Sequence, residues 1–556
     1  MANLLRARTG ARGAAAPGTG ENLAHSPIAA SEFSNGMAAY TSGDYHLAAR
    51  CFNAVIEAQH DAADAHYYLG LAYLKLNQVE DAVDCFVMAA HFRPDFAEAH
   101  HGLALVAQRR GEHREAASEL RQAISSRADY AEAYNALGAS VLELGNPQEA
   151  VANFEHAIAL KSDFAYAHNN LGYVLFRDLG EHERGAAHIK TALDLNHSDP
   201  GIWCNQSMVL MHQGRIEDAI QVCDRLLASN PELHEARLNR ALAKLKLGRF
   251  AEAWPDYEAR KLSRSNYIAR PFGFREWQGD PLTGKTVLVY AEQGIGDEIM
   301  FASCLREVVA RAGKCVIECA PRLEGLMRRS FPEQTVHGTE QSEAAPDWLT
   351  HVGRVDFQVA SGSLPGFFRR LETHFPRHGG YLRADPASVE RWRMRLCKLG
   401  GGARIGISWK GGTTSTRKQL RSIALAELLP FLRRKDTVFV SLQYGACGPE
   451  IEALLQASGV RVHHWQEAID DYDETAALVS ALDLVISVQT AVVHLAGALG
   501  KPVWVMVPAV AEWRYLQSGE TMPWYPSVRL FRQSRADDWG PVIDSVAAEL
   551  GQLAPS

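Results

Sequence analysis

A glycine turn near the middle of the chain carries the residue best suited to acid–base chemistry. The segment EQGIGD, residues 292–297, follows the apolar run TVLVYA and leads into a helical stretch. A carboxylate delivered by such a turn can take the proton of an acceptor hydroxyl, so Asp297 is a candidate general base. Its neighbours Gln293 and Gly294 are candidate contacts for the acceptor. The alternative is that Asp297 only caps the following helix.

A second loop combines paired glycines with positive charge. The sequence ISWKGGTTSTRKQLRS opens with a strand-like run, after which come Lys410, Gly411 and Gly412, and then the cations Arg417 and Arg421. Glycine amides together with cations match the charge and shape of a pyrophosphate, which a departing nucleotide must carry. This loop therefore predicts a site for a nucleotide diphosphate.

A third segment, SVQTAVVHLAGALGKP, follows another apolar run and begins a helix at Thr490. Amides at the start of a helix, with a hydroxyl beside them, can bind phosphate. His494 lies one helical turn further along and is a candidate for the same ligand, although a buried core histidine is the alternative. The complete set of candidate donor-binding residues is Ser408, Lys410, Gly411, Gly412, Thr413, Arg417, Arg421, Gln443, Gln489, Thr490 and His494.

The three loops argue against several other chemistries. The glycine turn lacks the third glycine of a dinucleotide-binding fingerprint, and it lacks the Gly-Lys-Ser/Thr ending of a P-loop. No Asp-x-Asp pair stands in these loops, and the histidines are not spaced as metal ligands. The sequence therefore predicts neither a metal site nor a cofactor.

Two series of short apolar runs must position these loops. They lie at residues 286–291, 315–319 and 355–360, and then at 404–409, 438–442, 460–464, 484–487 and 503–507. Continuous β-branched runs separated by helical patterns are typical of buried parallel sheets, which bind ligands at the carboxyl ends of their strands. We expect two Rossmann-like lobes, at residues 283–398 and, with a C-terminal helix, at 399–556. A junction over residues 264–282 precedes them.

Self-similarity dominates the chain before that junction. The residues that mark one repeat are Leu69, Gly70, Tyr73, Ala82, Phe86, Ala89 and Pro94. Their spacing is that of a tetratricopeptide repeat (TPR), whose period is about 34 residues. The pattern returns with this period, apart from a one-residue shift near residues 179–183. It predicts an α-solenoid of about seven repeats over residues 32–263. Residues 1–31, rich in Ala, Gly and Arg, are expected to be a disordered tail.

Stacked repeats of this kind form a long concave face that suits extended peptide ligands. Asn169 and Asn170 fall on the first helix of a repeat, whose side chains face that groove. They are therefore candidate contacts for an acceptor protein. The alternatives are plain solvation of the two asparagines, and an architectural spacer or a dimerisation surface for the array.

Composition excludes several functional classes. The 556 residues carry 57 Lys and Arg against 65 Asp and Glu, a formal net charge of −8, so no overall attraction to nucleic acid exists. No apolar stretch approaches the roughly 20 residues that a membrane span needs. The nine cysteines form no C-x-x-C pair, which indicates reduced thiols and a cytoplasmic protein.

Several motifs, in this order, carry a family resemblance. GRFAEAWPDYEAR, AEQGIGDE, ISWKGG, FVSLQYG and SVQTAVVHLAGALGKP resemble segments of bacterial tetratricopeptide-repeat glycosyltransferases with a heptosyltransferase-like GT-B region. The resemblance covers nearly the whole chain after the tail. It implies inverting, metal-independent transfer from a nucleotide sugar as co-substrate, with Asp297 as the base. Residues 410–414 and Arg421 match the donor-phosphate segment, and Thr490 and His494 match the second donor loop.

One position departs from that family pattern: Gln489 stands where heptosyltransferase-like sequences carry Asp. This departure puts transfer from ADP-heptose in doubt. UDP-GlcNAc and a CMP-linked nonulosonic acid are both candidate donors.

The architecture is also similar to that of protein O-glycosyltransferases, including bacterial enzymes that modify flagellin. It implies that the repeats select an acceptor protein, flagellin among the candidates, and that the lobes add a sugar to its Ser or Thr side chains. Two alternatives stay open. The acceptor is instead a glycan or lipopolysaccharide, or the lobes are catalytically inactive and only hold a scaffold of repeats.

Overall fold

The computed structural model describes residues 27–262, 270, 272–342, 344–412, 418–536 and 538–552. The chain forms two compact units, Met1–Asn205 and Gln206–Ser556. Residues 1–26 of the predicted tail and residues 264–269 and 271 of the predicted junction lie outside the described residues, as do Thr413 and Arg417.

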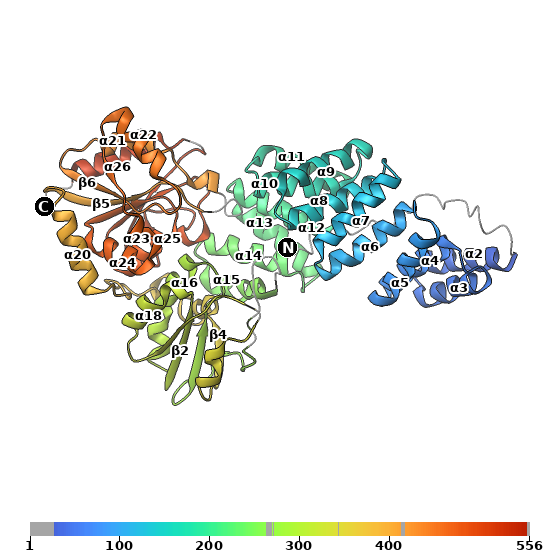
Figure 1. Cartoon of the computed structure of the whole chain (residues 1–556). Coiled ribbons are helices and arrows are strands. Elements are labelled where there is room, and N and C mark those ends of the chain that lie inside the picture. The colour runs from blue at the N-terminus through green and yellow to red at the C-terminus, as the bar shows by residue number, and fades with distance from the viewer. Residues whose placement is uncertain are drawn as a thin grey trace. The chain divides into compact units, whose positions relative to one another are not determined.

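Paired antiparallel helices make up the described chain from Pro27 to Tyr257 (Figure 1). They are α2 (Pro27–Ser42), α3 (Tyr45–Ala58), α4 (Ala63–Lys75), α5 (Val79–Phe92), α6 (Ala97–Arg110), α7 (His113–Ser126), α8 (Ala131–Glu143), α9 (Pro147–Leu160), α10 (Ala165–Arg177), α11 (His182–Leu195), α12 (Pro200–His212), α13 (Ile216–Ser229), α14 (His234–Lys246) and α15 (Phe250–Tyr257). Because α2 begins at Pro27, residues 27–31 are helical, whereas the sequence analysis assigned them to the tail.

The glycines of the repeat pattern allow the two helices of a pair to approach closely. A Cβ atom at Gly138 of α8 would lie 2.6 Å from the Phe154 ring of α9. Phe154 is fully buried there. Small and large residues therefore interlock at the positions that the period predicts, and the helical solenoid is confirmed.

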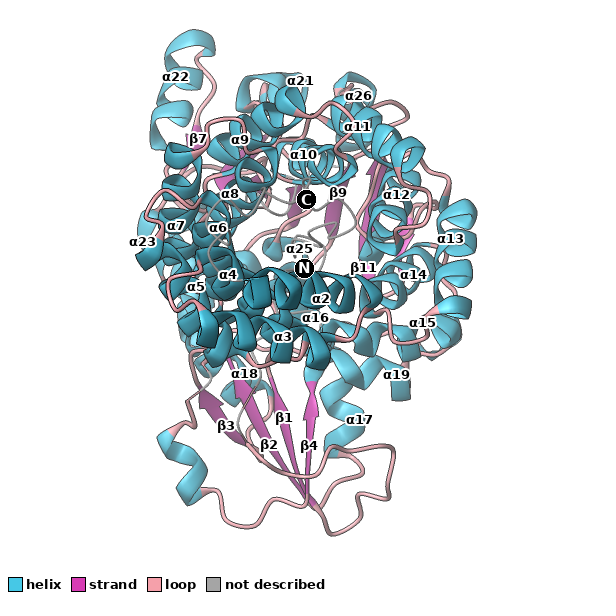
Figure 2. Ribbon diagram, turned by 90° about the vertical axis from the view of Figure 1, so that its right-hand side faces the viewer, coloured by secondary structure: helices cyan, strands magenta, loops and turns pink. Residues whose placement is uncertain are grey.

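The first lobe holds a four-stranded parallel sheet. Its strands are β1 (Thr286–Tyr290), β2 (Lys314–Cys319), β3 (Thr335–Gly338) and β4 (Phe357–Ala360). Figure 2 shows them side by side in the order β3-β2-β1-β4. Its helices are α16 (Ile295–Phe301), α17 (Leu305–Val309), α18 (Glu324–Ser330) and α19 (Leu364–Phe368).

The second lobe follows α20 (Pro386–Cys397) and holds a seven-stranded sheet. Its strands are β5 (Ala403–Ser408), β6 (Thr437–Ser441), β7 (Val462–His463), β8 (Leu484–Ser487), β9 (Val503–Val507), β10 (Thr521–Met522) and β11 (Tyr525–Arg532). Its helices are α21 (Leu429–Leu432), α22 (Gly448–Ser458), α23 (Gln466–Asp470), α24 (Tyr472–Ala481), α25 (Ala491–Ala498) and α26 (Gly540–Gln552).

Short 3-10 helices are also present among the described residues of the second unit. They are η2 (Glu258–Leu262), η3 (Ala302–Cys304), η4 (Pro321–Leu323), η5 (Asp347–His351), η6 (Ser361–Ser363), η7 (Glu372–His374), η9 (Lys418–Arg421), η10 (Leu425–Leu428) and η11 (Trp513–Tyr515).

Strand order determines where a ligand can approach each sheet. The large sheet has the order β10-β11-β9-β8-β5-β6-β7, with β10 antiparallel and the others parallel. The chain leaves β5 toward one edge and returns beside it as β8, so the order reverses between these two strands. In the small sheet the same reversal lies between β1 and β4. Open parallel sheets bind ligands outside the carboxyl ends of strands at such a reversal.

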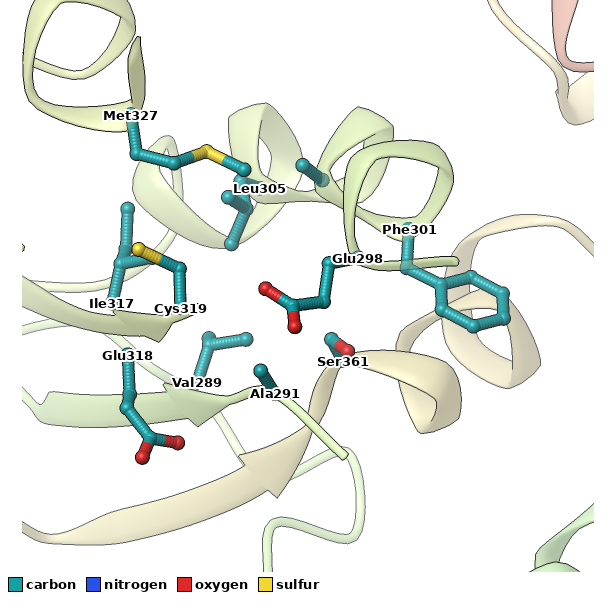
Figure 3. A pocket seen from close by; sticks show the side chains of 11 residues that line it. Val289, Ala291, Glu298, Phe301, Leu305, Ile317, Glu318, Cys319, Met327 and Ser361 are labelled. Atoms are coloured by element: carbon teal, nitrogen blue, oxygen red, sulfur yellow. The ribbon is translucent and has the colours of Figure 1, made fainter. Parts of the chain in front are cut away.

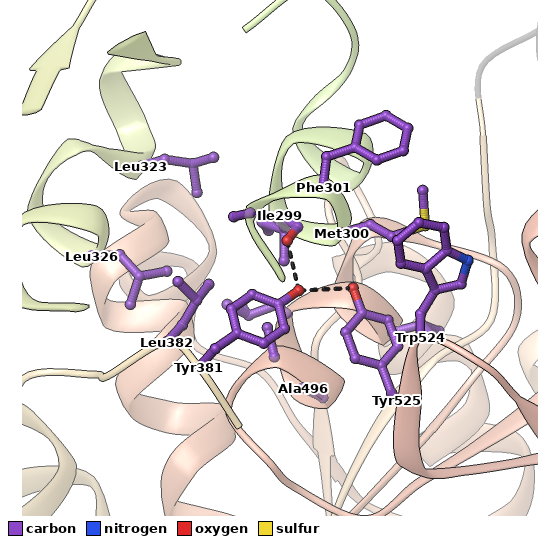
Figure 4. Close-up of a cluster of buried hydrophobic side chains, with 14 of the residues drawn as sticks. Ile299, Met300, Phe301, Leu323, Leu326, Tyr381, Leu382, Ala496, Trp524 and Tyr525 are labelled. Carbon is purple, nitrogen blue, oxygen red and sulfur yellow. Dashed lines mark hydrogen bonds between the residues drawn. The ribbon is translucent and has the colours of Figure 1, made fainter. Parts of the chain in front are cut away.

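Helix α16 of the first lobe packs directly against the second lobe. The Tyr381 hydroxyl, on the segment between the lobes, donates to the Ile299 carbonyl at 2.6 Å and lies 3.4 Å from the Tyr525 hydroxyl (Figure 4). The same view places Met300 and Phe301 beside Trp524. This apolar contact fixes the end of β1 against the second sheet.

Candidate active site

Asp297 lies in the first turn of α16 and faces the second lobe. Its Oδ1 atom accepts a hydrogen bond from Arg514 Nε at 2.6 Å and is also ion-paired with an Arg514 terminal nitrogen. The two side chains are only 17% and 18% exposed. The structure therefore joins the predicted base to a cation on η11, which the sequence analysis did not single out.

The glycine turn also contacts the segment SVQTAVVHLAGALGKP, which the sequence predicts to bind phosphate. A Cβ atom at Gly296 would lie 3.2 Å from the His494 ring and 3.5 Å from Ala491 Cα, at the start of α25. The loop after β1 therefore contacts the start of α25, which follows β8.

His494 is buried in this contact. Its Nδ1 atom lies 3.2 Å from the Tyr525 hydroxyl. Burial, with a smaller effect of the nearby Arg514 charge, lowers the pKa of His494 to about 3. The ring is therefore neutral at physiological pH, so it can position a ligand but adds no positive charge.

Two of the predicted donor loops lie in contact. A Cβ atom at Gly411 would meet the Gln489 carbonyl at 2.7 Å and the Thr490 Cγ2 atom at 3.2 Å, so only glycine fits there without displacement. Thr490 precedes α25 and makes no side-chain hydrogen bond to the helix amides. Its hydroxyl lies 3.0 Å from the Ser487 hydroxyl instead.

Gln489 has an unusual environment in this contact. The residue is buried, with only 2% of its surface exposed. Neither amide atom has a hydrogen-bond partner among the described residues. Buried polar atoms nearly always have partners, and an exception points to a ligand or a water molecule.

Gln443, at the end of β6, holds the loop after β5. Its Oε1 atom accepts hydrogen bonds from Lys410 N at 2.8 Å, from Trp409 N at 3.0 Å and from the Ser408 hydroxyl at 3.2 Å. Its Nε2 atom donates to the Lys410 carbonyl at 3.0 Å. The predicted residues Ser408, Lys410 and Gln443 therefore lie together, with Gln443 supporting the loop.

The predicted cations of this loop have defined neighbours. Lys410 Nζ is paired with Glu450 Oε2 at 2.5 Å. Arg421 ends η9, and its carbonyl accepts from Gly411 N at 3.0 Å. Gly412 lies in the left-handed region, with φ +79°, and its carbonyl accepts from the Tyr444 hydroxyl at 3.0 Å. A donor role for each of them stays a prediction.

Helix α15 and the following 3-10 helix η2 contact the glycine turn through side-chain hydrogen bonds. The Tyr257 hydroxyl of α15 lies 3.1 Å from Gln293 Nε2 and 3.3 Å from Gln293 Oε1. Arg260 of η2 donates to Glu292 Oε1 at 2.7 and 3.0 Å, and Glu292 is only 1% exposed. Gln293 and Gly294 of the predicted acceptor set are thus half-buried and exposed, respectively.

Helices α14 and α15 hold the loop that carries Arg514. Lys246 Nζ of α14 donates to the Ala511 carbonyl at 2.6 Å, and the Lys246 carbonyl accepts from Gln517 N at 2.9 Å. Trp254 and Tyr257 both stack edge-on against Trp513. We refer to α14, α15 and η2 as the brace, because they contact both loops that meet at Asp297 and Arg514.

Asn169 and Asn170 lie on α10, as the repeat pattern predicts, but both are buried. Asn170 Nδ2 donates to Asn135 Oδ1 of α8 at 3.0 Å, and Asn205 Nδ2 of α12 donates to Asn169 Oδ1 at 2.8 Å. These bonds link the first helices of neighbouring repeats. Acceptor binding by the two residues stays a prediction.

A small cavity lies on the far side of α16, inside the first lobe. Figure 3 shows Glu298 pointing into it, beside Ala291 and Ser361. Glu298 Oε2 accepts from Ala320 N at 2.9 Å, and burial raises the pKa of Glu298 to about 7. The cavity holds about one water molecule, so it cannot receive a sugar nucleotide.

Among the described residues, no three His, Cys, Asp or Glu side chains lie together as metal ligands. In the same part of the chain, no helix is both long and apolar enough to cross a bilayer.

The repeat region matches known families. The tetratricopeptide-repeat family matches residues 33–95, 101–152, 175–233 and 204–266, and a related TPR family matches residues 142–178. The N-terminal region is therefore an array of TPR repeats, which commonly bind proteins.

The chain is also similar to Protein FlbA of Caulobacter vibrioides. The two are 36% identical over 372 residues, which cover 63% of this chain and 61% of FlbA. The chain thus spans less than two thirds of the length of that relative.

Solved structures also align with part of the chain. A TPR protein of Thermus thermophilus is 22% identical, with 33% of this chain and 99% of that chain covered and a TM-score of 0.30. PilF of Pseudomonas aeruginosa is 23% identical, with 35% and 86% covered and a TM-score of 0.30.

Proposed function

We propose that this protein is an inverting, metal-independent GT-B glycosyltransferase that moves a sugar from a nucleotide donor to a Ser or Thr hydroxyl of an acceptor protein. The observation that carries the proposal is the meeting of the two lobes at their strand ends. There Asp297 of the first lobe lies against Arg514, and Gly296 lies against the start of α25. A base and an anion-binding loop on opposite lobes are the parts that such a transfer needs.

The second lobe offers the parts of a donor site. Its strand order reverses between β5 and β8, and the loops after these strands contain Gly411 and Thr490. Gln489, between them, presents a buried amide with no partner among the described residues. An amide both donates and accepts, so it suits the hydroxyl or carbonyl groups of a sugar or a base.

The proposed reaction needs only the residues of this chain and its two substrates. The Asp297 carboxylate takes the proton of the acceptor hydroxyl, and the hydroxyl oxygen forms a bond to the anomeric carbon. The bond from that carbon to the phosphate oxygen breaks, and the nucleotide leaves with the electron pair. Amides at the start of α25 and the cations Lys410 and Arg421 then stabilise the negative charge of the leaving group.

The TPR array supplies the acceptor specificity in this proposal, with flagellin as one candidate acceptor. We propose the cytoplasm as the compartment, since the cysteine pattern of the sequence is typical of reduced proteins.

Intact-mass analysis tests the proposal. Secreted and flagellar proteins are compared between the parent strain, a strain lacking this gene, and a strain carrying Asp297→Asn. We expect one protein to lose the mass of a sugar in both altered strains. No mass difference across these proteins would overturn protein glycosylation. A loss of sugar from lipopolysaccharide alone would instead identify a glycan acceptor.

A further inference from the structure

We propose that Arg514 is an anion-binding residue of the donor site. When no donor is bound, the Asp297 carboxylate takes the place of the donor phosphate on the Arg514 guanidinium. The inference rests on the proposed function and adds a residue and an order of events to it. Arg514 stands on η11, after β9, and no motif of the sequence marks it.

The position of Arg514 fits contact with a donor phosphate. Its partner Asp297 follows Gly296, which lies against Ala491 and His494 of α25. The start of α25 has no side-chain cap, so its amides are suited to an anion. The partnerless amide of Gln489 immediately precedes Thr490, the residue before α25. The uncapped start of α25 and the partnerless Gln489 amide are two features that suit a ligand, and Asp297, the partner of Arg514, follows the glycine that contacts this helix start.

The contacts of Arg514 show what the ligand would replace. In the described chain, Asp297 Oδ1 is the hydrogen-bond acceptor of its guanidinium, and Glu512 lies 4.0 Å away. A buried ion pair contributes little net stability, because desolvation of both charges offsets their attraction. Arg514 is bound by only one oxygen atom of Asp297, Oδ1. A donor phosphate offers several oxygen atoms to the same guanidinium, so it can displace Asp297.

The exchange gives the site an order of events. Without donor, Asp297 Oδ1 is engaged by Arg514. When the donor phosphate takes Arg514, the carboxylate becomes available to the acceptor hydroxyl. The base is therefore released only when a sugar is present to be transferred.

The test measures binding of nucleoside diphosphates (UDP, CDP, ADP and GDP) and of CMP to the full-length protein by calorimetry. We expect Arg514→Ala to weaken binding of the preferred nucleotide about 10-fold or more, since a hydrogen bond to a charged group is lost. We expect Asp297→Asn to tighten binding at least about 3-fold, because the competing carboxylate is gone.

The double variant separates competition from simple repulsion. If Asp297 acts by occupying Arg514, Asp297→Asn has no effect on nucleotide affinity in the Arg514→Ala background. A persistent tightening there would indicate repulsion alone and would overturn the exchange. Arg514→Lys covers the case in which Arg514→Ala does not fold: it keeps the charge, and we expect it to bind nucleotide more weakly than wild type but more tightly than the alanine variant.

A second ion pair between the lobes provides the control. Arg329 of α18 is paired with Asp473 of α24, away from the proposed site. Arg329→Ala and Asp473→Asn should leave nucleotide affinity unchanged. If they change it as much as the Arg514 and Asp297 variants do, the effect comes from lobe closure and the inference fails. If the wild-type protein binds none of the nucleotides, the proposed function fails as well.

Discussion

Gln489 is a residue whose contributions to stability and to binding should oppose each other. Its buried amide lacks partners among the described residues, which costs about 1–3 kcal/mol of folding free energy. We expect Gln489→Met, which keeps the volume, to stabilise the nucleotide-free protein by roughly 1 kcal/mol and to weaken nucleotide binding. Urea unfolding and calorimetry measure the two effects.

Gln443 is the matched control for that substitution. It is also buried, but its Oε1 atom accepts from Trp409 N and Lys410 N. Gln443→Met should therefore destabilise the protein, since it leaves these amides without an acceptor. Equal changes in folding stability for Gln489→Met and Gln443→Met would contradict the expectation that only the Gln443 amide stabilises the protein through its hydrogen bonds.

Glu298 should make stability depend on pH. Burial raises its pKa from the ordinary value of 4.5 to about 7 in the folded protein. Between these pH values the folded state binds more protons than the unfolded state. The contribution of Glu298 to stability is therefore present in full below pH 4.5 and is lost as the pH rises through 7. The loss is roughly 3 kcal/mol.

Glu298→Gln should remove this dependence. Its amide oxygen can still accept from Ala320 N, so the variant should match the wild type at pH 4.5 and exceed it at pH 8. The comparison is made by urea unfolding at both pH values. Parallel pH profiles for the two proteins would show that Glu298 does not titrate near 7.

The candidate site was only partly predictable from the sequence. Asp297, Gly411 and Thr490 were readable because each stands in a local motif after an apolar run. Arg514 was not, because its partner lies 217 positions away and no local pattern surrounds it. Tyr257 was assigned to the repeats, and only the fold shows that it contacts Gln293.

The loop after β5 depends on a glycine that touches the loop after β8. We expect Gly411→Ala to destabilise the protein by about 1–3 kcal/mol, since its Cβ would lie 2.7 Å from the Gln489 carbonyl. Nucleotide binding should fall with it, because both loops shift. Gly448→Ala is the control: nothing lies within 4 Å of its Cβ position, so it should neither lower the unfolding temperature nor change affinity.

Strands varied in how clearly the sequence indicated them. The predicted runs at 286–291 and 484–487 became β1 and β8, because strands buried on both faces are continuously apolar. β3, with the sequence TVHG, was missed because only Val336 in it is fully buried. β11 was missed because YPSVRLFR alternates and contains Pro526, which weakens a strand signal.

The boundary between the two compact units lies before the end of the repeat pattern. The second compact unit begins at Gln206, so the brace belongs with the lobes. We expect residues 206–556 to fold and to bind nucleotide but not to modify the acceptor protein. Circular dichroism, calorimetry and intact-mass analysis of the acceptor measure these properties.

Removal of residues 1–262 should have a different result. It deletes Arg260, the partner of the buried Glu292, and breaking such a buried pair costs about 3–5 kcal/mol. It also exposes Trp513, which stacks on Trp254 and Tyr257. This fragment should unfold at lower temperature or aggregate. Equal stability of the two fragments would show that the brace is dispensable.

The place of the brace has an evolutionary consequence. Helices α14 and α15 hold loops of both lobes, so they cannot be duplicated or lost without disturbing those loops. The repeats before Gln206 belong to a separate compact unit. Among relatives of this chain, gain and loss of whole repeats should therefore be confined to the region upstream of Gln206, so that the range of recognised acceptors can diversify while the chemistry stays constant.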